Sequence, residues 1–327
     1  MASPLPSTPI MLACITLAAF CALGAPLLTY SLTLAVFGAA HVLTELRFVE
    51  ARFSGRLSER LLWGIGAGLL TVGMLRLLSR LGVTPPMETL QLELFTVTGL
   101  AALTLPALWR RSAGALLVGL LVTTVIGVGV WAVPLETILI LACLHNWTPV
   151  GFLAEALPEA DWRRGMGLAL LAFVGVPAVI FAVGPMGWLD FSVLPTTGTL
   201  ADNLGAWLPP RAHDASWAAA VFATMAYAQC MHYAVVIGVL PRLVPPGPDA
   251  DHALGLSRLP VGIFVGGVIV LSAALLVGYG LDFREARGWY GVLAAVHAWL
   301  EVPVLLLALT GPIARGHDSQ PAAGAAG

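Results

Sequence analysis

The stretch that decides the fold is AVHAWLEVPVLLLALTG, residues 295–311, which places His297 four residues before Glu301 inside an apolar run. The segment FGAAHVLTELRF, residues 37–48, repeats this spacing with His41 and Glu45. Residues four apart lie on one face of a helix. Ionisable side chains in the hydrocarbon layer of a membrane cost about 3 kcal/mol each, so they usually face the protein interior and mark a functional site. The two segments therefore predict membrane helices with inward-facing polar groups.

The composition indicates a polytopic membrane protein. Of 327 residues, 58% are hydrophobic and only 10% are charged, and the mean hydropathy is +0.89. A soluble chain needs a far more polar surface. All sixteen cationic side chains are arginine. The absence of lysine excludes a retinal Schiff base and a Walker-type phosphate loop, and no basic run indicates binding to nucleic acid.

The apolar runs predict an all-α, polytopic transmembrane bundle with about ten spans, since one crossing needs about 20 residues. The predicted spans are 9–24, 27–46, 61–79, 90–109, 113–133, 135–155, 166–184, 217–240, 260–281 and 289–313. We expect residues 1–313 to form a single integral-membrane domain and residues 314–327 a disordered cytoplasmic tail. With both termini cytoplasmic, eleven arginines fall on the inner side and five on the outer side, as the positive-inside rule favours.

Four of the seven histidines fall within predicted spans: His41, His145, His232 and His297. They lie on the second, sixth, eighth and tenth spans, which run in the same direction across the membrane. Their depths differ by only about 10 Å, at a rise of about 1.5 Å per residue. We therefore expect the four imidazoles to converge on a central site. The other three histidines lie in loops or in the tail, where solvation is the simpler interpretation.

Four imidazoles suit a borderline metal such as iron (Fe²⁺), zinc or copper. Glu45 and Glu301, the candidate catalytic residues, could complete the coordination, could orient an imidazole by accepting its second N–H, or could permit a dinuclear iron site. Three other interpretations stay open. The histidines could form interhelical hydrogen bonds, line a transporter or proton relay, or bind a non-covalent haem.

Five side chains near the histidines complete the predicted pocket: Asn146, Trp147, Gln229, Tyr233 and Trp299. The three polar ones suit hydrogen bonds, either to the site or between helices. The two tryptophans suit the wall of a pocket for an apolar substrate. Glu93 lies near an outer helix end, where we expect it to be solvated in the membrane interface.

Four motifs follow one another along the chain: AAHVLTEL, ACLHNWTPVGF, QCMHYAVV and AVHAWLEV. In their order they resemble the histidine helices of the bacterial and archaeal β-carotene dioxygenases of the Brp/Blh family, although Val236 stands where the family has a second histidine in the third motif. The resemblance implies a non-haem iron dioxygenase of a prokaryotic plasma membrane, with the four histidines as ligands. It also implies that dioxygen reacts with a lipophilic substrate, such as a carotenoid or another isoprenoid.

Overall fold

The computed structural model describes residues 5–187, 191–244 and 255–309, and every regular element in these ranges is helical. The predicted tail 314–327, the end of the last predicted span and two loop or tail histidines, His252 and His317, lie outside the described residues.

Eight helical segments are long and apolar enough to cross a membrane. They are α2 (Pro26–Phe53), α3 (Glu59–Arg80), α4 with α5 (Pro86–Ala102 and Leu105–Trp109), α6 (Ala113–Ala132), α9 with α10 (Glu159–Leu170 and Val176–Val183), α12 (Ala218–Gly238), α13 (Val261–Leu281) and α14 (Phe283–Leu309). A ninth is the pair α7 (Pro134–His145) and α8 (Thr148–Ala156), which is bent by 41°.

The remaining predicted span corresponds to α1 (Thr8–Gly24), which has only 17 residues. At about 1.5 Å per residue α1 is roughly 25 Å long, whereas the hydrocarbon layer is about 30 Å thick. Eight or nine spans thus replace the predicted ten. The short elements are α11 (Leu200–Asn203), a π-helical turn (Leu171–Gly175) and 3₁₀ turns at Ser54–Arg56, Leu204–Ala206, Pro210–Ala212 and Leu240–Leu243.

Local sequence explains where several helices begin. Pro26 and Pro134 stand at the first positions of α2 and α7, where a proline ring fits and no amide hydrogen is missed. The Ser112 hydroxyl caps α6 by accepting from the Ala115 amide at 3.0 Å. Pro149, in the first turn of α8, cannot continue α7 because it lacks an amide hydrogen. The break before it leaves His145 as the last residue of α7.

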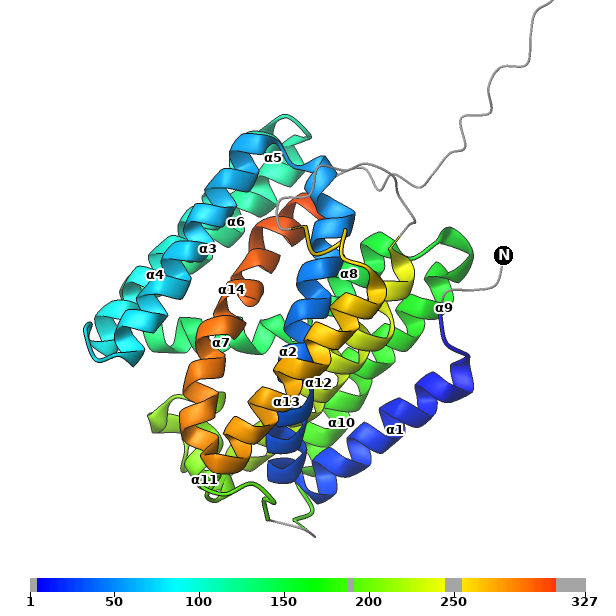
Figure 1. The fold of residues 1–327 in the computed structure, drawn as a ribbon, viewed down its shortest axis with the longest axis vertical. Helices are drawn as coiled ribbons and strands as arrows, with labels where there is room; N and C mark the ends of the chain where they lie inside the picture. Colours follow the sequence, from blue (N-terminus) through cyan, green and yellow to red (C-terminus); the bar gives the residue numbers. More distant parts are fainter. Residues whose placement is uncertain (1–4, 188–190, 245–254, 310–327) are drawn as a thin grey trace, which may run out of the picture.

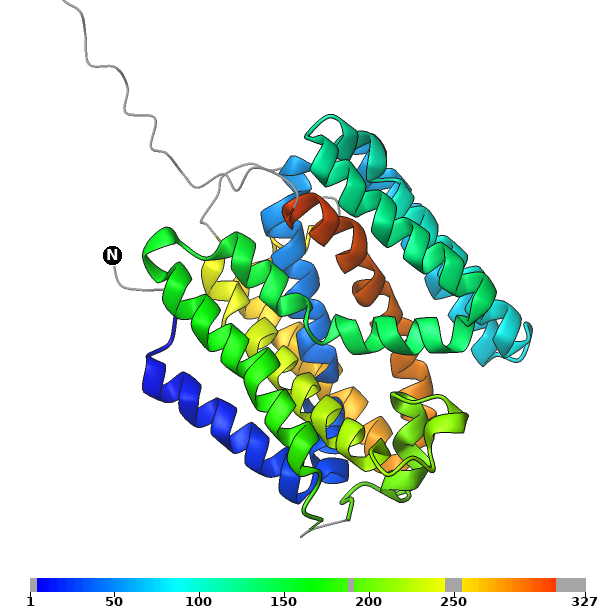
Figure 2. The ribbon, with the colours of Figure 1, turned by 180° about the vertical axis from the view of Figure 1, so that it is seen from behind.

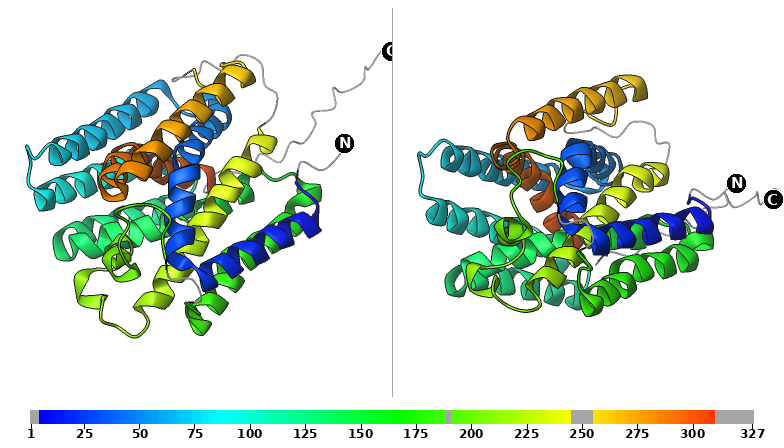
Figure 3. Two further views of the ribbon diagram at one scale, coloured as in Figure 1. Left: turned by 60° about the horizontal axis from the view of Figure 1, so that its bottom comes forward. Right: turned by 90° about the horizontal axis from the view of Figure 1, so that it is seen from below.

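The histidine-bearing helices lie in the middle of the bundle. In Figure 1, α3, α4 and α6 flank α14 on one side, and α1, α9 and α10 lie on the other side of α2 and α12. Figure 2 shows α7 running across the other helices instead of along them. The two views of Figure 3 show α13 on the outside of the bundle, beside α2. The transverse path of α7 brings its C-terminal end toward the central helices.

Large apolar side chains are exposed on the outer faces of the bundle. On α13, Ile263, Ile269 and Val270 are each more than 60% exposed. Soluble proteins do not expose such continuous apolar surface, whereas lipid tails contact it without penalty. The surface therefore agrees with a multi-pass membrane protein, as the sequence predicts.

Candidate metal centre

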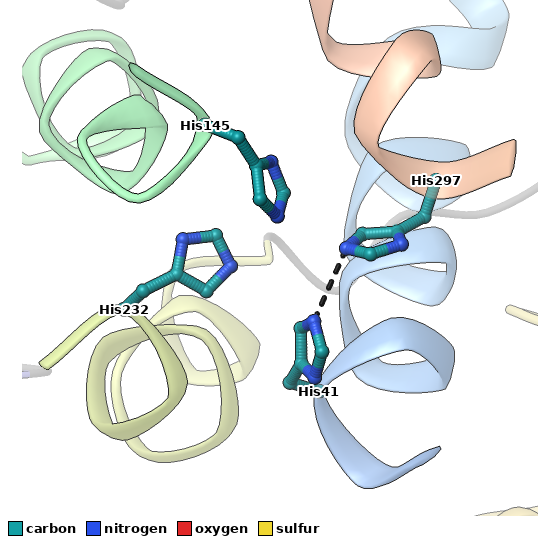
Figure 4. Close-up of side chains that lie close together, drawn as sticks. All are labelled: His41, His145, His232 and His297. Atoms are coloured by element: carbon teal, nitrogen blue, oxygen red, sulfur yellow. Dashed lines mark hydrogen bonds between the residues drawn. The ribbon is translucent and has the colours of Figure 1, made fainter. Parts of the chain in front are cut away.

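Three buried imidazoles and one half-buried imidazole, that of His145, meet in the centre of the bundle. His41 comes from α2, His145 from the end of α7, His232 from α12 and His297 from α14. One ring nitrogen of each lies within 4.8 Å of the corresponding nitrogens of the others. Figure 4 shows that each ring directs a nitrogen into the same central space. The predicted convergence is confirmed.

The rings approach one another by their edges, which suits shared coordination. The Nε2 atoms of His41 and His297 are 3.1 Å apart. The ring centroids of His145 and His232 are 4.5 Å apart, and those of His145 and His297 are 4.9 Å apart. Metal–imidazole bonds are about 2.0–2.1 Å long, so ligand nitrogens on one ion lie about 3–4 Å from one another. Small side-chain movements would therefore let all four bind one ion.

Several polar atoms of this cluster have no hydrogen-bond partner. His41, His232 and His297 are at most 2% exposed. Both ring nitrogens of His232 and Nδ1 of His297 are without a partner. An unsatisfied buried polar group costs about 1–3 kcal/mol, and native structures contain few of them. A bound metal ion would satisfy one of the unpartnered His232 nitrogens, so the donor set fits a metal.

The two glutamates lie against the histidines, but each faces a histidine of another helix. Glu301 accepts from Nδ1 of His145 at 2.5 Å and from the Thr148 hydroxyl at 2.7 Å. Glu45 Oε2 lies 3.4 Å from Nε2 of His232, and neither Glu45 oxygen accepts a hydrogen bond. Glu45, His232 and Glu301 form a second group whose candidate ligand atoms lie within 4.8 Å.

Two of the predicted pocket residues, Tyr233 and Gln229, lie on α12 and make different contacts. Tyr233 stacks on the His41 ring, with centroids 3.9 Å apart and planes inclined by 21°. Gln229 donates from Nε2 to the Tyr30 carbonyl at 3.2 Å and to the Thr33 hydroxyl at 2.9 Å. Tyr233 therefore holds the ring of a histidine, whereas Gln229 joins α12 to α2.

At the α7–α8 break, the neighbours of His145 stabilise the backbone. Asn146 is buried and donates from Nδ2 to the Ala142 carbonyl at 3.3 Å. Trp147 donates from Nε1 to the Phe173 carbonyl in the π-helical turn at 2.5 Å, and its side chain packs on the hydrophobic core. Trp147 thus lines neither of the cavities that reach the histidines.

The sequence interpretation of Glu93 is wrong, because this residue is buried. Arg76 donates to both Glu93 oxygens at 2.8–3.0 Å, and Trp299 donates from Nε1 to Glu93 Oε1 at 2.6 Å. Arg76 also donates to the Gly291 carbonyl at 2.9 Å. The sequence contains one indication that Glu93 is buried. Arg76 lies inside the predicted span 61–79, and a cation in a membrane helix requires an anionic or polar partner. This network links α3 and α4 to α14, between His297 and Glu301.

Two cavities reach the cluster from different sides. One of 220 Å³ is lined by His41, His145 and His297, together with polar side chains such as Arg287. The other, of 310 Å³, lies between α6, α7 and α14 and is lined by His145, Glu301 and mainly aliphatic side chains. Trp299 lines both cavities, as the sequence predicts for a pocket wall, and His145 is their common polar residue.

Comparison of the chain with protein-family models, with curated proteins and with solved structures found no match. The resemblance to the Brp/Blh family therefore rests on the four histidine motifs. The fold and geometry by themselves describe a polytopic helical membrane protein with a buried histidine and glutamate cluster that could hold a metal.

Proposed function

We propose that this protein is an integral-membrane non-haem iron oxygenase that acts on a lipophilic substrate. One observation carries the proposal. Four imidazoles from four helices converge in the bundle core, with unpartnered ring nitrogens and two adjacent carboxylates. Imidazole and carboxylate ligands together suit iron, and bound iron would supply redox chemistry with dioxygen.

The residues around the ion have separate tasks in this proposal. The Glu301 carboxylate accepts from Nδ1 of His145, which leaves Nε2 of that ring free to bind the ion. Thr148 fixes Glu301 by donating its hydroxyl hydrogen. The stacked ring of Tyr233 holds His41 in place. His41, His232 and His297 are at most 2% exposed, and such burial limits side reactions of a reactive centre.

The apolar cavity supports a lipophilic substrate. Its walls carry side chains such as Val122, Leu144 and Leu305, and its inner end is formed by His145 and Glu301. Leu144 is 55% exposed on the outer surface of the bundle. A hydrophobic molecule dissolved in the bilayer could therefore approach the cluster without crossing water. The choice of a carotenoid or another isoprenoid follows from the family resemblance.

Metal analysis tests the proposal directly. The wild-type protein and the variants His145→Ala and His297→Ala are purified in detergent from iron-supplemented cells. The variant His213→Ala is the matched control, because His213 lies outside the spans and contacts the Leu208 carbonyl at 3.1 Å. We expect iron in the wild type and the control, and strong loss in both cluster variants. A folded wild type without metal, retaining its activity in a membrane process, would refute the proposal.

A transporter or proton relay is the second candidate, favoured by the two cavities that reach His145 from different sides. Flux through proteoliposomes that persists after metal removal would support it. A haem carrier is disfavoured because the imidazoles lie with ring centroids only 4.5–5.4 Å apart. A planar macrocycle has no room between them, so we expect no Soret band.

A further inference from the structure

The two glutamates have the same spacing from a histidine in the sequence, yet their surroundings differ. Both oxygens of Glu301 accept hydrogen bonds, one from His145 and one from Thr148. Both oxygens of Glu45 are buried and have no hydrogen-bond partner. Glu45 is only 1% exposed. A carboxylate in this position is costly unless a cation or a donor satisfies it.

Glu45 faces His232 and Glu301, and neither of its oxygens forms a hydrogen bond with them. Its Oε2 lies 3.4 Å from Nε2 of His232, and its candidate ligand atom lies within 4.8 Å of those of His232 and Glu301. Neither Glu45 nor His232 lines the two cavities that reach the cluster. Substrate in those cavities would therefore meet His145 and His297, whereas Glu45 faces the closed side of the site.

Charge balance points in the same direction. A divalent ion on four neutral imidazoles would leave two positive charges in the membrane interior, which is unfavourable. The carboxylates of Glu45 and Glu301 would balance these charges. In the described part of the chain, neither glutamate forms an ion pair with an arginine. The negative charges of Glu45 and Glu301 are therefore available to balance the charge of a bound metal ion.

We infer that Glu45 is a fifth, direct ligand of the metal ion, and that Glu301 is a positioning residue that acts only through His145. The inference rests on the proposed metal site and assigns different roles to two glutamates that the sequence presents as equivalent. It also predicts one ion per chain, because in this assignment Glu301 stays hydrogen-bonded to His145 and binds no ion.

The test is titration of the metal-free full-length protein in detergent with Co²⁺ alone, followed by visible absorption, which reports the ligand set. Glu45→Gln removes the anionic ligand, so we expect its affinity to fall by more than about 100-fold and its spectrum to change. Glu301→Gln keeps an acceptor for His145, so we expect an unchanged spectrum and an affinity loss of about 10- to 100-fold, as for other groups that orient a ligand. Glu136→Gln, in the first turn of α7, is the matched control.

A second measurement does not depend on folding of the Glu45 variant. In the Glu301→Gln protein, Glu45 is the remaining carboxylate of the cluster. We expect infrared difference spectra with and without Zn²⁺ to show a shifted carboxylate stretch, and absence of the shift would overturn the inference.

Three titration outcomes are distinguishable. If the wild type binds no Co²⁺, the proposed function itself fails. If it binds one ion and Glu45→Gln keeps the wild-type spectrum and affinity, only the assignment of Glu45 fails. Two ions per chain would also overturn the assignment, in favour of a dinuclear centre.

Discussion

Replacing Glu93 by leucine tests whether the buried Arg76–Glu93–Trp299 network holds α14 in place. The substitution removes the acceptor for three hydrogen bonds from Arg76 and for one from Trp299. The guanidinium of Arg76 retains its bond to the Gly291 carbonyl. Its charge is then left without a counter-ion inside a membrane helix.

The expected cost is about 3 kcal/mol. Breaking a buried ion pair by removing one partner costs about 3–5 kcal/mol. Glu93 is 3% exposed but Arg76 is 29% exposed, so partial solvation of the arginine favours the lower end of this range. For a protein of this size, we expect the unfolding temperature to fall by roughly 5 °C. Because Trp299 stands between His297 and Glu301 on α14, we also expect weaker metal binding.

The assay is thermal unfolding in detergent for Glu93→Leu, for Arg76→Leu and for the double variant. A double-mutant cycle isolates the interaction of the pair. We expect the double variant to be more stable than Glu93→Leu alone, since it carries no uncompensated charge, with a coupling energy of about 2 kcal/mol. Additive effects, or a loss below about 0.5 kcal/mol for Glu93→Leu, would refute the reasoning.

Three further predictions follow from the site and its surroundings. Val122→Phe fills part of the apolar cavity, so turnover of a lipophilic substrate should fall while metal content per chain stays at the wild-type value. Removal of the metal with a chelator should lower stability by about 4 kcal/mol relative to protein held at 1,000 times the dissociation constant, seen as a lower unfolding temperature. The Thr199 amide and hydroxyl hold the pKa of Asp202 below its usual range. The stabilisation of this turn is therefore complete above about pH 4 and lost as the pH falls through the lowered pKa, so low pH should lower the protection of the Thr199 amide against hydrogen exchange relative to its intrinsic rate, and Asp202→Asn should abolish this dependence.

The sequence predicted the spans well because membrane helices are set by local composition. A run of apolar residues must satisfy its backbone internally, and a helix does so within one segment. Each of the ten predicted segments is helical over most of its length. The predicted count of about ten exceeds the eight or nine helices that are long enough to cross, because α1 has only 17 residues.

The sequence also predicted the convergence of the histidines, because helices of alternating direction place His41, His232 and His297 at similar depths. His145 reaches the same centre differently, since α7 runs across the bundle. It could not predict which groups would pair. Spacing of four residues places His41 and Glu45 on one helix face, but Glu45 lies against His232 of α12, and Glu301 bonds His145 of α7. Pairing across helices depends on how each helix is rotated about its axis, which is set by packing of side chains distant in the sequence.

Composition and periodicity by themselves determined that this chain is a helical membrane protein with polar groups directed inward, since the bilayer penalises any other arrangement. Only the tertiary structure decided that Glu93 is buried with Arg76, that α7 crosses the bundle, and that one cluster glutamate is hydrogen-bonded while the other is not. These features depend on contacts between separate helices. Within the membrane, such contacts are selected by close packing and polar pairing, which no single segment of the sequence encodes.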